Sequence, residues 1–150
     1  MMPILLLLAA ATADTPKTAC VRMEPVAGFE AWGKEAKPAL AVGSTTTLHL
    51  QPARSVTFKP ALSRPAKNGT YGAYVPLTLT RPGRYRVAVS QGAWIDMVSR
   101  GERLKSVAHN HGPACSGIAK IVAYDLKPGR YWLQLSDAKK PTIAAMVSSR

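Results

Sequence analysis

Hydrophobic and polar residues alternate along several short segments of the chain, and this period of two is typical of β-strands with one buried face. The alternation is clearest at residues 45–50, 74–80, 85–90 and 131–136, and shorter apolar segments occur at residues 56–58, 94–99, 104–108, 121–126 and 142–147. The best helical segment, residues 29–37, is short and ends before Pro38, and 12 prolines and 11 glycines interrupt the chain. About eight or nine closely spaced strands with at most one short helix predict an antiparallel all-β sandwich or barrel.

One motif occurs twice, as RPGRYRVAVS at residues 81–90 and as KPGRYWLQLS at residues 127–136. Proline fixes φ and glycine adopts a positive φ, so Pro-Gly predicts a type II turn that joins two strands as a hairpin in each copy. In each second strand, one set of side chains is expected in the core: Tyr85, Val87, Val89, Tyr131, Leu133 and Leu135. The opposite faces would then carry Arg84, Arg86, Arg130 and Trp132.

The repeated PG-x-Y unit, the AWIDMV segment at residues 93–98 and the turn at Arg100-Gly101 resemble the bacterial pre-peptidase C-terminal (PPC-like) domains. This resemblance covers about residues 70–147 and implies a jelly-roll β-sandwich of the kind found on secreted proteins. The whole chain is also similar to a group of small exported alphaproteobacterial proteins, through GFEAWG, AWIDMV and HxHGPxC followed by GIxKIV. Members of that group are often labelled homogentisate 1,2-dioxygenase. True homogentisate dioxygenases are longer, cytoplasmic and cupin-like, with iron held by two histidines and a glutamate.

The N-terminal segment ILLLLAAATA, residues 4–13, has the length of a signal-peptide core and is too short to span a bilayer. Small residues at Ala11 and Ala13 predict cleavage after Ala13, which leaves one domain at residues 14–150. No lysine or arginine precedes the apolar run, and a lipoprotein acylated on Cys20 is the alternative. No other apolar run approaches about 20 residues, so no transmembrane segment is expected. The sequence therefore predicts a periplasmic or secreted protein.

Export changes the meaning of the two cysteines, Cys20 and Cys115, because an oxidising compartment allows them to pair. A Cys20–Cys115 disulfide would restrict the unfolded chain by roughly 4 to 5 kcal/mol in the chain-entropy model. A free thiol and a metal ligand are the competing interpretations.

The segment HNHGPAC, residues 109–115, has the only spacing typical of metal ligands. In an extended segment His109 and His111 point the same way and could reach one Fe, Cu or Zn ion. Candidate further ligands are Cys115, if it is not bridged, and His49, Glu102 or Asp96. The alternative is a polar loop whose histidines make ordinary hydrogen bonds, in a protein without a cofactor.

Charge is the other unusual feature, since 20 Lys+Arg against 8 Asp+Glu give a net charge of +12. The basic residues are scattered and exported proteins rarely meet nucleic acid, so nucleic-acid binding is not expected. The repeat would gather one basic set around an aromatic residue, Arg81, Arg84, Arg86, Lys127, Arg130 and Trp132. Such a surface could attract an anionic envelope surface, an acidic glycan or an acidic protein. The simpler interpretation is a set of solvated faces.

Alternation along residues 94–97 leaves one question open. If Ile95 and Met97 are in the core, Trp94 is exposed beside Asp96 and suits a ligand; if Trp94 is in the core, Asp96 is partly buried and needs a partner. No nucleophile motif, close carboxylate pair or phosphate loop is present in the sequence. A non-catalytic binding or accessory domain is therefore the expected function, and the alternative is a metal-binding protein or metal-dependent oxygenase that uses the HxHGPxC loop.

Overall fold

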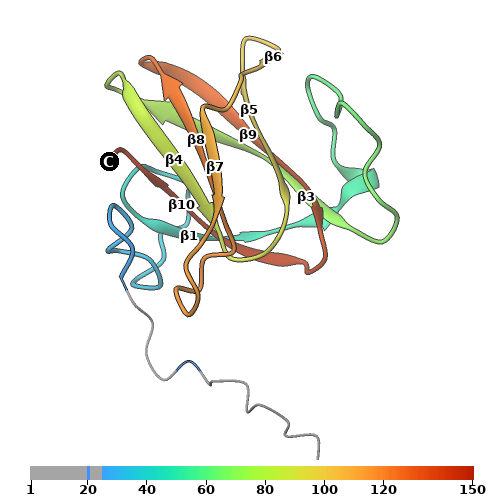
Figure 1. The fold of residues 1–150 in the computed structure, drawn as a ribbon. Helices are drawn as coiled ribbons and strands as arrows, with labels where there is room; N and C mark the ends of the chain where they lie inside the picture. Colours follow the sequence, from blue (N-terminus) through green and yellow to red (C-terminus); the bar gives the residue numbers. More distant parts are fainter. Residues whose placement is uncertain (1–19, 21–24) are drawn as a thin grey trace, which may run out of the picture.

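The computed structural model describes Cys20 and residues 25–150, and the predicted signal peptide and its cleavage site lie outside the described residues. The described chain forms two five-stranded antiparallel sheets that pack face to face (Figure 1). The strands are β1 (Thr45–His49), β2 (Gln51–Pro52), β3 (Tyr71–Leu79), β4 (Gly83–Val89), β5 (Trp94–Ser99), β6 (Glu102–Arg103), β7 (Ala108–His111), β8 (Lys120–Leu126), β9 (Gly129–Ala138) and β10 (Thr142–Ser148), with a 3-10 turn η1 (Ala53–Ser55).

The order of the strands is that of a jelly roll. Sheet A runs β1-β10-β4-β8-β7 and sheet B runs β2-β3-β9-β5-β6. The chain changes sheet six times, between β1 and β2, β3 and β4, β4 and β5, β6 and β7, β8 and β9, and β9 and β10, so these connections wrap around the sandwich. The short strands β2 and β7 are additions at two sheet edges. The predicted antiparallel β-sandwich of the jelly-roll type is confirmed.

The core lies between the two sheets and is filled by one face of each long strand. The repeat residues expected to point inward are buried, and Val87, Leu133 and Leu135 have no exposed surface. They belong to a single apolar cluster to which both sheets contribute. Period-two alternation therefore identified the buried faces of β4 and β9 from the sequence.

The two copies of the repeat form corners between the sheets, and the hairpins predicted from Pro-Gly were wrong. β3 and β8 each end at a corner, and the chain continues into the opposite sheet as β4 and β9. Gly83 and Gly129 have φ of 156° and 153°, far from the type II value of about 80° and in a region that only glycine adopts readily.

A tyrosine closes each corner. The Tyr85 hydroxyl donates to the Arg81 carbonyl at 2.6 Å, and the Tyr131 hydroxyl donates to the Lys127 carbonyl at 2.7 Å. The two corners adjoin, because β3 pairs with β9 and β4 pairs with β8. The motif occurs twice because each copy places a buried tyrosine that fixes the chain where it passes from one sheet to the other.

Three other local predictions were wrong. Residues 29–37 form consecutive turns instead of a helix, with Phe29 N–H bonded to Val26 O and Trp32 N–H to Phe29 O. Gly33, which has a positive φ, interrupts this segment, and Gly28, also with a positive φ, immediately precedes it. Residues 56–58 lie in an irregular loop, and residues 104–107 connect β6 to β7.

The outer face of sheet A is covered by residues 25–35, which we call the N-terminal cover. Phe29 is fully buried there against Ile118, Ile121 and Met146. Arg86 on β4 holds the cover, since its guanidinium lies 4.8 Å from the Phe29 ring and donates to backbone carbonyls at both ends of the described chain, Ala27 and Arg150.

The predicted disulfide joins Cys20 to Cys115, with 5.4 Å between their Cα atoms. It ties the residues preceding the N-terminal cover to the loop between β7 and β8. The prediction of this pair from the sequence is confirmed.

The outer face of sheet B is covered by residues 53–70, which we call the loop cover; in Figure 1 this green segment lies beside β3, away from the blue N-terminal segment. The Gln134 side-chain amide donates to Pro60 O at 2.9 Å, the Tyr74 hydroxyl to Lys59 O at 3.2 Å, and the Arg103 guanidinium to Ala61 O at 2.6 Å. These bonds hold only the middle of the loop cover. The fully buried Gln134 Oε1 has no hydrogen-bond partner among the described residues.

Candidate anion-binding site

Trp94, the first residue of β5, faces solvent at the end of sheet B where the loop cover ends. Ile95 and Met97 point into the core, so Trp94 and Asp96 share the outer face. Trp94 is 41% exposed, and its indole N–H donates to Asp96 Oδ2 at 3.1 Å. The question that the sequence left open is thereby answered: Trp94 is the exposed residue, and an acid fixes its orientation.

Two cations lie against the Trp94 ring from different parts of the fold. The Arg64 guanidinium, from the loop cover, is 4.8 Å from the ring centroid, and the Lys120 ammonium, from the first residue of β8, is 5.3 Å away. Lys120 also donates to Ala93 O at 3.0 Å, across the gap between the sheets. Three segments that are remote in the sequence therefore meet at one indole.

Lys120 occupies an unusual position for a cation. On β8 its side chain points to the same side as those of the core residues Val122 and Tyr124, that is, between the two sheets. Because Lys120 is the first residue of the strand, its ammonium can reach solvent at the end of the sandwich. Burial lowers the pKa of Lys120 from its ordinary value, and the Asp96 carboxylate opposes that shift. A partly desolvated ammonium at this place gains from any anion that approaches it.

Around Trp94 the surface forms a hollow of about 360 Å³, which we call the tryptophan hollow. Its cationic lining residues are Arg64, Lys67, Lys120 and Lys139. The one carboxylate that lines it, Asp137, accepts a hydrogen bond from the Lys67 backbone N–H at 2.9 Å. In the part of the chain that the structure describes, the only ion pair joins Arg84 to Asp125, so none of these cations forms a salt bridge with a described carboxylate.

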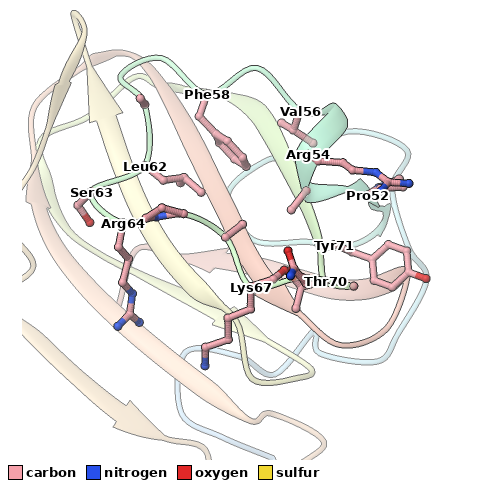
Figure 2. A pocket seen from close by; sticks show the side chains of 16 residues that line it. Pro52, Arg54, Val56, Phe58, Leu62, Ser63, Arg64, Lys67, Thr70 and Tyr71 are labelled. Atoms are coloured by element: carbon pink, nitrogen blue, oxygen red, sulfur yellow. The ribbon is translucent and has the colours of Figure 1, made fainter.

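The loop cover encloses a second, larger hollow of about 780 Å³, the loop hollow, which Figure 2 shows from close by. Phe58 and Leu62 point into it, together with Val56. Arg64 and Lys67 line both hollows. In Figure 2 their charged ends extend away from the space that the loop encloses.

The basic set expected from the repeat is divided between the two outer faces. Arg84 and Arg86 lie on sheet A, whereas Arg130 and Trp132 lie on sheet B, because the corners carry the chain from one sheet to the other. Arg81 and Lys127 are exposed at the two adjoining corners. The structure therefore does not bring these six residues onto one face.

Several members of that set already have partners. Arg84 makes two hydrogen bonds to Asp125, at 2.8 and 3.1 Å, which raise the pKa of Arg84 and lower that of Asp125. Trp132 stacks on Tyr74 with 4.4 Å between the ring centroids, and the Arg130 guanidinium lies 5.2 Å from the Trp132 ring.

The two histidines of the HNHGPAC segment lie on the edge strand β7. His109 and His111 are exposed and share one face, as the spacing predicted, and His111 lines the tryptophan hollow. His49 lies on β1 at the opposite edge of sheet A, and Cys115 is bonded to Cys20. Within the described residues no three His, Cys, Asp or Glu side chains are grouped to hold one metal ion.

Sequence reasoning missed the cations of the tryptophan hollow, Arg64, Lys67, Lys120 and Lys139. One signal could have found Lys120, which stands at a core-facing position of β8 although the next core-facing residues, Val122 and Tyr124, belong to the apolar core. Residues 53–70 form a long connection of the kind that is usually functional, which marks the segment but no single cation within it.

Comparison of the chain with family models, with curated proteins and with solved structures finds no match. Across the described residues, the structure contains no helix that is long and apolar enough to cross a membrane.

Proposed function

We propose that the protein is an exported, non-catalytic binding module that captures an acidic group of an envelope component at the tryptophan hollow. The observation that carries the proposal is the pair of cations, Arg64 and Lys120, held against the half-exposed Trp94 without a salt bridge to any described carboxylate. Carboxylate, sulfate and phosphate groups all bind to such donors through charge-assisted hydrogen bonds.

An acidic glycan suits this hollow better than an acidic protein surface does. The apolar face of a sugar ring can pack on the exposed part of the indole while its acidic group reaches Lys120 or Lys139. The hollow also has the dimensions of a small-ligand site rather than those of a protein interface.

Export is supported by the Cys20–Cys115 disulfide, because such bonds persist in oxidising compartments. It is also supported by the signal-like segment at residues 4–13. The resemblance to PPC-like domains agrees with a small jelly roll that binds without catalysing a reaction.

The test is a charge reversal with a matched control. Lys67→Glu/Lys139→Glu changes two exposed cations of the tryptophan hollow, and Arg81→Glu/Lys127→Glu changes two exposed cations at the corners by the same charge. With polygalacturonate as the probe, we expect the first pair to weaken binding about tenfold or more and the second about twofold. Titration calorimetry at two salt concentrations measures both.

Equal losses in the two double variants would contradict the proposal, since they would indicate that the net charge of +12 attracts any polyanion. Trp94→Ala sharpens the result. It leaves the charge unchanged, and we expect it to weaken binding because the packing surface for the sugar is lost.

A further inference from the structure

The loop hollow is larger than the tryptophan hollow and has a mixed wall. Val56, Phe58 and Leu62 supply an apolar patch beside polar lining residues, and none of the residues that line it carries a carboxylate. Its volume of about 780 Å³ falls in the range of pockets that bind small molecules. The apolar patch offers a contact surface for a hydrocarbon group.

The two hollows are connected through shared side chains. Arg64 and Lys67 contribute to both, and their charged ends project out of the loop hollow (Figure 2). Long cationic side chains of this kind bury their methylene stems against apolar surface and keep their charge in solvent. The apolar patch of the loop hollow therefore lies directly beside the candidate anion-binding site, and the same two cations stand at the boundary between them.

We infer that the ligand is an amphipathic anion that carries one alkyl chain, with the chain in the loop hollow and the acidic headgroup at Arg64 and Lys67 next to the tryptophan hollow. This inference rests on the proposed function, because it assigns the second half of the ligand to a neighbouring site. Charge complementarity selects the anion: both hollows are bordered by cations, and the loop hollow has no acid that would favour a cationic amphiphile.

The experiment measures how affinity depends on chain length. Inorganic phosphate and butyl, hexyl and octyl phosphate are titrated below their micelle concentrations against the whole protein. We expect inorganic phosphate to bind weakly and the affinity of the esters to rise by up to about fourfold for each added methylene, the value for complete burial. An affinity that does not change from butyl to octyl phosphate would overturn the inference.

Two variants separate the sites. Leu62→Gln is expected to flatten the dependence on chain length while inorganic phosphate binds as before, and Leu62→Met, which conserves volume, is expected to keep the dependence. Lys67→Glu/Lys139→Glu should weaken every ester by a similar factor and preserve the slope. If Leu62→Gln leaves the dependence of affinity on alkyl-chain length unchanged, the alkyl chain binds elsewhere and the inference is overturned.

The failure of this inference and the failure of the proposed function give different results. If polygalacturonate and inorganic phosphate bind at the tryptophan hollow but the esters show no slope, only the alkyl chain is rejected. If neither of these two anions binds, the proposed function fails and the inference fails with it. Octyl glucoside, which has the same chain without the charge, should bind more weakly than octyl phosphate, and equal affinity would reject the anionic headgroup.

Discussion

Each of the two covers lies over the outer face of one sheet, but the contacts that hold them in place differ. The N-terminal cover lies on sheet A with Phe29 fully buried, with Arg86 bonded to its backbone, and with a disulfide just before it. The loop cover lies on sheet B, holds to it through a few hydrogen bonds, and encloses the loop hollow. The N-terminal cover leaves a small hollow of about 180 Å³, whereas the loop cover leaves a larger one of about 780 Å³ with unpaired cations beside it.

The difference between the two covers indicates which part of the fold carries the candidate binding site. Native interiors pack closely and satisfy their polar groups, so a hollow, a buried oxygen without a partner and a group of unpaired cations stand out. The larger loop hollow and Gln134 lie at sheet B, and the unpaired cations gather around Trp94 at the end of that sheet, with Lys120 contributed by β8 of sheet A.

The largest expected effect comes from the disulfide. Cys20→Ser/Cys115→Ser opens a loop with a sequence separation of 95, and we expect the free energy of unfolding to fall by about 4 to 5 kcal/mol as an upper value. Urea denaturation measures the fall. Polygalacturonate binding should be unchanged under native conditions, and lost binding in a folded variant would show that the two covers are coupled.

The next effect compares one phenylalanine in each cover. Phe29→Ala removes a fully buried ring and should lower the free energy of unfolding by about 3 to 5 kcal/mol. Phe58 is half-buried at the loop hollow, and Phe58→Ala should lower it by about 1 kcal/mol. Thermal and urea unfolding of the two variants test the contrast, which equal losses would contradict.

The smallest effect concerns pH and Lys120. Burial lowers its pKa, and a bound anion favours the charged form, so binding of the anion is coupled to uptake of a proton. Affinity should therefore fall as the pH rises through the lowered pKa, by about fivefold for the loss of one such contact. Titrations of the wild type across the alkaline range up to pH 10.5, the ordinary value for this group, measure the fall.

Lys120→Arg is the matched control, because arginine stays charged over that range. It should bind the anion with little dependence on pH. The same fall in both proteins would assign the effect to other groups and remove Lys120 from the site.

Much of the fold followed from local pattern, and the errors have identifiable causes. Alternation located several of the long strands because a strand with one buried face shows that period in its own residues, as at the end of Tyr71–Leu79. The Pro-Gly units predict hairpins, and this prediction is wrong because the sequence shows that the chain turns but not which sheet it then joins. Residues 29–37 resembled a helix, although Phe29 serves to cover sheet A.

The candidate site could be predicted only in part. Trp94 and the pairing of Cys20 with Cys115 were within reach of the sequence, since an aromatic beside an acid and two cysteines in an exported chain are local or compositional signals. The basic set chosen from the repeat was divided by the corners between two faces. Arg64, Lys67 and Lys139 carry no pattern that marks them among the other basic residues.

The alternation between core and solvent, the positions of the turns and the amount of positive charge can all be read from the amino-acid sequence. These properties depend on neighbouring residues or on their sum. The meeting of Arg64 and Lys120 at Trp94 is visible only in the folded protein, because it depends on strand order and on the path of the loop cover. Contacts between distant segments follow from how whole sheets pack, and no short stretch of sequence contains that information.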